Sequence, residues 1–239
     1  MKKLPIFTIN FRRQFVNLLI FIMLGVVTTF AILGVNLVST SSVVNGVYYS
    51  GNENSNKISL MINVYWGTEY LDGMLDILDK YDVKTTFFVG GTWAVKESDM
   101  LTKIYEKGHE IGNHGYGHKD QDKLSREDNK KEILTTHNIV KDLLGIDMTL
   151  FAPPSGAYSK TTVEVANELS YQTIMWTRDT IDWRDKDANL IYSRAIKNAK
   201  GGDLVLMHPT QKTLEALENI IVELQSKGFK LTTVSDALT

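Results

Sequence analysis

The sequence predicts an α/β fold in which parallel strands alternate with helices. Short apolar runs rich in β-branched residues are followed repeatedly by longer segments whose apolar residues recur at helical spacing. Seven such strand–helix units can be counted, an order typical of a parallel sheet covered by helices. An open doubly wound sheet and a barrel both fit this count. The 239 residues suffice for one domain with a full core plus an accessory segment.

The N-terminal region has the features of a membrane anchor. Residues 14–38 form a long apolar stretch without a charged residue, which is enough to cross a bilayer as a helix. Four basic residues lie within residues 1–13, so we expect this tail in the cytoplasm and the rest of the chain outside. A retained anchor is favoured over a cleaved signal peptide, because the run is long and no convincing small-residue cleavage site follows it.

Residues 39–56 are rich in Ser, Asn and Gly, which predicts a linker between the anchor and a domain at 57–239. Removing the four basic residues of the tail from the 26 Lys+Arg leaves 22 against 28 Asp+Glu. The exported part is therefore acidic, and nothing in its charge indicates nucleic-acid binding. The chain has no cysteine, so a domain outside the cytosol relies on its core rather than on disulfides.

The elements of the domain are assigned from periodicity and from their end signals. Ser125, followed by Asp128 three residues later, is an N-cap for one helix, and Gly108 closes another. The predicted strands are residues 57–64, 84–89, 109–113, 149–152, 171–176, 203–208 and 229–234; the predicted helices are residues 69–81, 98–108, 125–145, 161–169, 188–199 and 213–228.

The segment GHEIGNHGYGH, residues 108–118, contains the strongest chemical signal. His114 and His118 are four residues apart after a strand-like run, and two imidazoles at this spacing can reach one divalent metal ion. A third histidine, His208, ends the predicted strand DLVLMH. The motifs FAPPSG (151–156) and RDTIDW (178–183) lie between them and also follow predicted strands. Because carboxyl ends of parallel strands meet at one edge, these motifs are expected to lie close together.

These motifs, in this order, resemble those of the polysaccharide deacetylases, carbohydrate esterases with a NodB-like domain, from about Ile58 to the C-terminus. The resemblance implies a distorted (β/α) barrel with its site at the carboxyl ends of the strands. It implies a divalent metal, with zinc the expected ion, held by His114 and His118. The metal would polarise the acetamide carbonyl and activate a water. The implied partner is an extracellular N-acetylated cell-wall polysaccharide such as peptidoglycan.

The resemblance also implies roles for later motifs. His208 matches the general acid that protonates the leaving amine, and Asp179 matches the aspartate that hydrogen-bonds to this histidine and tunes it. Asp182 completes the same motif. His109 and His137 have no expected role in the reaction. The expected substrate contacts are Trp183, Pro154 and Leu206, with Met207 beside Leu206 at the acetyl pocket.

Two positions depart from the family pattern. The first motif is normally Thr-Phe-Asp-Asp-Gly, but residues 61–67 read Met-Ile-Asn-Val-Tyr-Trp-Gly. Asn63 therefore takes the place of the base aspartate and Val64 that of the metal-binding aspartate. The Trp-Gly pair resembles a variant found in sporulation-type deacetylases. Ala152 stands where the family has an arginine that pairs with the base aspartate. The two replacements fit together, because an arginine opposite Asn63 would be a buried charge without a counter-ion.

Three functions remain open from the sequence. The chain is expected to be a metal-dependent N-deacetylase with an altered site, in which another carboxylate helps to ionise the water; Glu69 and Asp72 are nearest in sequence. Alternatively it is an inactive, membrane-anchored glycan-binding relative, or a scaffold whose histidines bind metal for stability. The retained His114, His118, Asp179 and His208 favour the first two.

Overall fold

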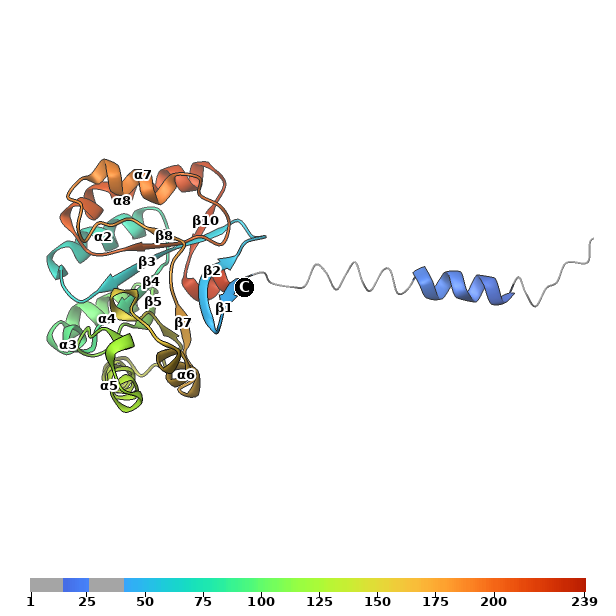
Figure 1. Ribbon diagram of the computed structural model, residues 1–239. Coiled ribbons are helices and arrows are strands. Elements are labelled where there is room, and N and C mark those ends of the chain that lie inside the picture. The colour runs from blue at the N-terminus through green and yellow to red at the C-terminus, as the bar shows by residue number, and fades with distance from the viewer. Residues whose placement is uncertain (1–14, 26–40) are drawn as a thin grey trace, which may run out of the picture. The chain divides into compact units, whose positions relative to one another are not determined.

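The computed structural model describes residues 15–25 and 41–239. The chain divides into two compact units, Met1–Val38 and Ser39–Thr239 (Figure 1). Residues 15–25 form a helix, and in the described parts of the chain no helix has the length and apolar character needed to cross a membrane. Most of the anchor predicted at residues 14–38 lies outside the described residues.

The second unit is built on a curled, mostly parallel sheet with helices on its outside (Figure 1). Its strands follow the order β1-β2-β7-β6-β5-β4-β3-β9-β8, and β10 pairs with the start of β3. Among the strands that the structure describes, only β1 and β2 pair antiparallel. The strands are β1 (Ser41–Val44), β2 (Val47–Asn52), β3 (Lys57–Val64), β4 (Thr86–Val89), β5 (Glu110–Asn113), β6 (Leu150–Phe151), β7 (Gln172–Ile174), β8 (Arg178–Asp179), β9 (Leu204–Met207) and β10 (Lys230–Thr232).

The sheet is therefore an open half-barrel rather than a closed one. The strands β1 and β8 stand at the two ends of the order and do not pair with each other. The predicted distorted barrel is confirmed in its parallel strand order and its outer helices, and it takes the form of a curled half-barrel.

The helices fill the outside of the curl. Ser125 accepts the backbone N–H of Asp128, which confirms the predicted N-cap of the longest of them. The described helices are α2 (Thr68–Lys80), α3 (Gly91–Lys96), α4 (Ser98–Glu106), α5 (Arg126–Leu144), α6 (Lys160–Glu168), α7 (Ala188–Ile196), α8 (Gln211–Ser226) and α9 (Val234–Leu238), with single 3₁₀ turns at η1 (Gln121–Lys123) and η2 (Pro154–Gly156).

Strand β3 separates two apolar cores. Side chains of successive strand residues point to opposite faces of a sheet. Ile62 and Val64 belong to the large outer core between the sheet and the helices, whereas Met61 belongs to a smaller inner core on the concave face. Asn63, two residues after Met61, therefore points to the concave face as well.

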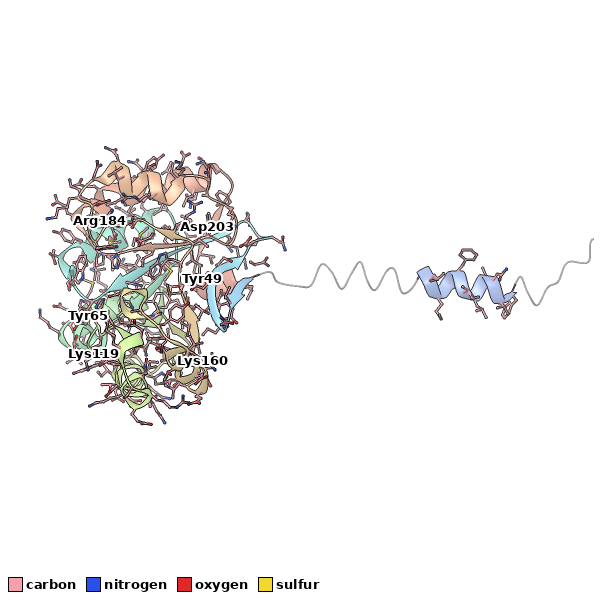
Figure 2. The ribbon with its side chains drawn as sticks, in the orientation of Figure 1. Tyr49, Tyr65, Lys119, Lys160, Arg184 and Asp203 are labelled. Atoms are coloured by element: carbon pink, nitrogen blue, oxygen red, sulfur yellow. The ribbon has the colours of Figure 1, made fainter. Side chains whose placement is uncertain are left out.

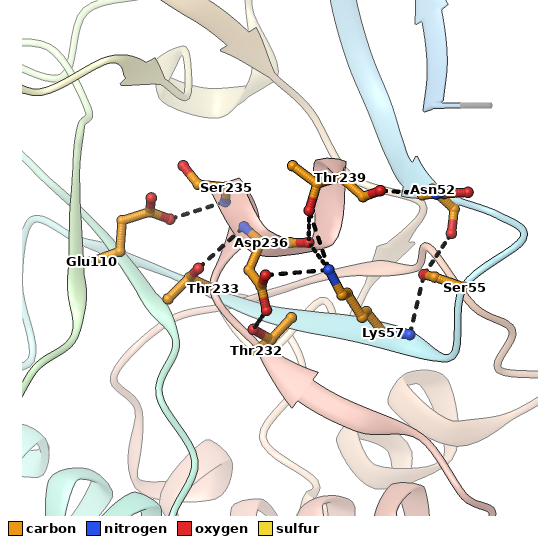
Figure 3. Close-up of polar contacts among 9 residues, drawn as sticks. All are labelled: Asn52, Ser55, Lys57, Glu110, Thr232, Thr233, Ser235, Asp236 and Thr239. Carbon is orange, nitrogen blue, oxygen red and sulfur yellow. Dashed lines mark hydrogen bonds and ion pairs between the residues drawn. The ribbon is translucent and has the colours of Figure 1, made fainter. Parts of the chain in front are cut away.

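The C-terminal helix α9 closes one end of the concave face. Val234 and Ala237 of α9 belong to the inner core. The Lys57 ammonium donates to the backbone oxygen of Asp236 at 2.8 Å and to its carboxylate at 3.2 Å, and Asn52 donates to the backbone oxygen of Thr239 at 3.0 Å (Figure 3). These contacts hold α9 against β2 and β3, which leaves the carboxyl ends of the strands open for a site.

The prediction of a linker over residues 39–56 is wrong. Residues 41–44 and 47–52 form the hairpin β1–β2, and β2 pairs in parallel with β7. Asn45 and Gly46 have φ values of 52° and 83°, as a type I′ hairpin turn requires. The Ser- and Asn-rich composition concealed this Asn-Gly turn, whose neighbours on both sides are valines.

Burial of His109 predicts a pH-dependent stability. Its Nδ1 accepts the backbone N–H of Thr85 at 3.2 Å, and burial lowers its pKa to about 4. The unfolded chain takes up this proton near its ordinary pKa of about 6.5, so stability falls as the pH drops from there toward 4. His109→Gln should reduce the slope of unfolding free energy against pH in this window by up to about 1.4 kcal/mol per pH unit.

Urea denaturation at a series of pH values measures this slope. Equal slopes for the wild type and His109→Gln between pH 6.5 and 4 would contradict the expectation.

Candidate functional site

A pocket of about 310 Å³ opens at the carboxyl ends of the strands, as the motifs predicted. The predicted residues Asn63, His114, His118, Asp179, Trp183, Leu206 and His208 all line it. Sequence reasoning did not assign a site role to the other lining residues, which are Tyr65, Trp66, Ser155, Gly156 and Trp176. Pro154 is buried and is not among the lining residues, whereas its neighbours Ser155 and Gly156 are.

The first motif presents one polar side chain to the pocket. Asn63 is 4% exposed, and its Oδ1 has no hydrogen-bond partner within the described chain. Val64 is fully buried in the outer core. The position that matches the metal-binding aspartate thus points away from the pocket, and the position that matches the base carries a neutral amide.

The two motif histidines lie side by side. His114 and His118 have ring centroids 5.1 Å apart with planes at 70°. Two imidazoles bound to one tetrahedral zinc, with Zn–N bonds of about 2.0–2.1 Å, have centroids about 5 Å apart. The His114 Nδ1 lies 2.7 Å from the backbone oxygen of Ala152, which fixes Nδ1 as the donor and leaves Nε2 unprotonated.

Both rings are neutral near pH 7. Burial, helped by the neighbouring His118, lowers the pKa of His114 to about 3. Burial also lowers the pKa of His118. A neutral imidazole is the form that binds a metal ion.

His208 is held by a buried carboxylate, which is that of Asp182. The Nδ1 of His208 lies 2.8 Å from Asp182 Oδ1, while Asp182 Oδ2 accepts the backbone N–H of His208 at 2.6 Å and the Thr213 hydroxyl at 2.6 Å. The prediction that Asp179 contacts this histidine is wrong: Asp179 Oδ1 accepts the backbone N–H of Ile181. Ile181 has a left-handed φ of 56°, and this turn brings the second aspartate of the motif, rather than the first, to the histidine.

Aromatic side chains surround the histidines. The Trp66 ring stacks on His208 with centroids 5.9 Å apart and planes at 8°, and the Tyr65 ring lies 4.9 Å from that of His118. Trp183 is 56% exposed at the rim. A second cavity of about 390 Å³ shares Trp66 and Trp183 with the first pocket. Asp182, Lys186 and residues of α2 and α8 also line it. Exposed apolar side chains at the rim of a polar pocket are typical of ligand-binding surfaces.

The pocket is poor in acidic groups. Asp179 is the only carboxylate among the described residues that line it. Glu69 faces the second cavity instead, and Asp72 forms an ion pair with Lys103 at 2.6 Å. Neither of the two carboxylates suggested by their nearness in sequence is therefore placed to act as a base.

A family model described as polysaccharide deacetylase matches residues 50–174. The chain belongs to the polysaccharide deacetylase family. The matched residues include the first-motif strand β3, both metal-motif histidines and the FAPPSG segment.

Relatives within the family differ in what their names say of activity. YlxY of Bacillus subtilis, an uncharacterized protein, is 39% identical over 190 residues, which are 80% of this chain and 60% of that protein. The peptidoglycan-N-acetylglucosamine deacetylase PgdA of Listeria monocytogenes is 33% identical over 165 residues, 69% of this chain and 35% of that protein. This chain thus spans less than two thirds of either relative.

A solved structure shares the fold closely. It is a CE4 family pseudoenzyme from Bacillus anthracis, with a TM-score of 0.80 and 35% identity over 82% of this chain and 70% of that one. A mutant of that pseudoenzyme, described as having restored enzymatic activity, also has a TM-score of 0.80 and is 34% identical over 82% of this chain and 72% of that one.

The two aspartates of the RDTIDW motif, Asp179 and Asp182, should differ in their effect on stability. Asp182→Ala removes a buried carboxylate with three hydrogen bonds, so we expect the unfolding free energy to fall by about 3 kcal/mol. Asp179→Ala removes a partly exposed carboxylate that accepts one hydrogen bond, and it should lower the unfolding free energy by less than about 1 kcal/mol. Urea unfolding of the two variants measures the difference, and a greater loss in Asp179→Ala would contradict the assignment of Asp182.

Proposed function

We propose that the pocket binds an N-acetylated cell-wall glycan such as peptidoglycan, and that it retains an N-deacetylase site whose hydrolytic step is impaired. The observation that carries this proposal is Asn63. It occupies the pocket at the base position, and an uncharged amide oxygen cannot take up a proton as a carboxylate does. The remaining elements, a histidine pair and a carboxylate-held histidine, are present.

The relatives support both halves of the proposal. Proteins named as peptidoglycan deacetylases share about a third of their residues with this chain over the matched region. The pseudoenzyme and its reactivated mutant support the view that this fold can lose hydrolysis while it keeps the architecture of the site.

The histidine pair fits a divalent metal in part. His114 and His118 are neutral imidazoles at a separation suited to one ion, and the unpartnered Oδ1 of Asn63 offers an oxygen in the same pocket. A metal ion bound there would polarise the acetamide carbonyl. No carboxylate is available from position 64, so we expect weaker binding than at a site with three protein ligands that include an aspartate.

The chain's own residues would divide the reaction between them. A water attacks the acetamide carbon, the C–N bond breaks, and acetate and a free amine form. The proton lost by the water needs an acceptor, and Asp179 is the carboxylate that the described pocket offers. The amine needs a proton, which the Nε2 of His208 can supply, since its Nδ1 is engaged by Asp182. Trp66 and Trp183 would hold the sugar rings at the rim.

Restoring the base and its counter-charge tests the impairment. General-base assistance is typically worth about 10²–10⁴ in rate, so wild-type acetate release from N-acetylated oligosaccharides should be slow. We expect Asn63→Asp with Ala152→Arg to raise it at least tenfold, because the pair restores a proton acceptor together with its counter-ion. Each single change should do little, since each adds an unpaired charge to a buried site.

Ala152 lies in the inner apolar core, so Ala152→Arg alone should also lower the melting temperature. His208→Ala in the double-variant background should abolish the gained activity. A wild-type rate typical of metal hydrolases that Asn63→Ala leaves unchanged would show that the base lies elsewhere.

Metal binding can be measured separately from activity. Cobalt and zinc should bind the wild-type chain weakly, and either His114→Ala or His118→Ala should lower the affinity at least tenfold, since each removes one of two imidazole ligands. Calorimetry measures the affinity, and His137→Ala, on a helix outside the pocket, is the matched control. Tight zinc binding in the variant that lacks both His114 and His118 would rule out this pair as the metal site.

We also propose that residues 14–38 anchor the chain in the cell membrane with the domain outside. The absence of charge in this stretch and the basic residues before it support the proposal. Protease added to intact cells should remove the domain and leave a membrane-protected N-terminal fragment. A mature N-terminus found between residues 39 and 56 would instead show a cleaved signal peptide.

A further inference from the structure

The turn that carries His118 is held in place by a buried carboxylate from another element. Glu132 lies on α5, and its side chain is only 4% exposed. Its Oε2 accepts the backbone N–H of Tyr116 at 2.9 Å and that of Gly117 at 2.7 Å. Its Oε1 forms an ion pair with Lys119 at 2.9 Å. The carboxylate therefore binds residues immediately before and after His118.

The turn needs such a partner because its backbone is unusual. His118 has a left-handed φ of 51°, a conformation that a residue other than glycine seldom adopts unless its surroundings impose it. Gly115, with a φ of 71°, begins the same turn. An added Cβ there would lie 3.4 Å from Pro154 and 3.7 Å from the Glu132 carboxylate, so the turn packs directly against both.

The opposite side of the turn is also fixed. The N–H groups of Gly91 and Thr92 donate to the backbone oxygens of Gly115 and Tyr116 at 2.9 and 3.1 Å. The N–H groups of Tyr116 and Gly117 point the other way, and Glu132 is the acceptor that the structure gives them. Without Glu132, two partly buried donors would lose their partner, and the strained residue His118 would follow directly after them.

We propose that Glu132 is a positioning residue, which fixes the imidazole of His118 beside that of His114 so that both reach one ligand. The role rests on the proposal that these histidines bind a metal ion. Glu132 does not line the pocket, so it acts through the backbone of residues 116–119 rather than by touching what is bound. Lys119, which pairs with Glu132, and Tyr65, whose ring packs on His118, lie at the same side of the domain (Figure 2).

Histidine-ring NMR of the full-length chain tests this directly. The chain has five histidines, so each ring signal can be assigned by substitution. In Glu132→Ala we expect the His118 signal to shift or broaden, while the signals of His109 and His137 stay in place. Glu132→Gln keeps an oxygen acceptor for the two N–H groups and should restore most of the wild-type signal. Lys119→Met removes only the ion pair and should leave it unchanged.

Asp203→Ala is the matched control for loss of a buried carboxylate. Asp203 is 1% exposed, accepts the backbone N–H of Lys200 at 2.9 Å and pairs with Arg178, but it lies outside the pocket. Both alanine variants should have lower melting temperatures. Only Glu132→Ala should weaken cobalt binding, by about 10- to 100-fold, as loss of residues that orient metal ligands typically does.

The proposal is overturned if the His118 signal and the cobalt affinity of Glu132→Ala match those of Asp203→Ala. If the wild-type chain binds no cobalt, the proposal that His114 and His118 bind a metal ion is wrong. The NMR signals of the metal-free chain still test the role of Glu132. If the His118 ring signal does not shift or broaden in either Glu132→Ala or Glu132→Gln, the positioning role of Glu132 is wrong.

Discussion

The alternation of side chains along strand β3 governs both the core and the site. This strand pairs with β9 on one side and with β4 and β10 on the other, and its residues are buried on both faces. One set of alternate residues packs under the helices, and the other packs inside the curl. Successive side chains of a strand point to opposite faces of the sheet. Because Met61 points to the concave face, Asn63 must also point there and Val64 must point to the outer face. The chemistry at the first motif follows from this register.

Around that strand, the proposed function rests on one carboxylate-held histidine and on an adjacent histidine pair. His208, the proposed proton donor, is hydrogen-bonded to the buried carboxylate of Asp182. His114 and His118 lie side by side, and burial lowers the pKa of His114. Relative to the pattern that the resemblance implies, an amide at Asn63 and a methyl group at Ala152 stand where an aspartate and an arginine would pair. These two replacements keep the net charge of the buried site unaltered, which avoids the large cost of a single unpaired charge in a low-dielectric interior.

Three residues with strained backbone conformations help to shape the pocket. His118, Ser155 and Ile181 all have left-handed backbone conformations, and each lies in a segment that follows a strand and borders the pocket. Such conformations persist where surrounding contacts impose them, as Glu132 does for the turn of His118. At the other end of the curl, α9 and its contacts with Lys57 fill the concave face, so that a ligand has access from the carboxyl ends of the strands.

The sequence by itself determined the α/β class, most of the strand and helix positions, and the histidines His114, His118 and His208, because these depend on periodicity and on local spacing. It also contained the hairpin at Asn45-Gly46, a local signal that composition masked. Only the tertiary structure decided which aspartate holds His208. Asp179 and Asp182 stand in one short loop, and the turn at Ile181 determines which of them reaches the ring. The same is true of Glu132, which meets the His118 turn through the packing of α5 rather than through any motif. Contacts between segments far apart in sequence depend on how layers pack, and no local pattern encodes them.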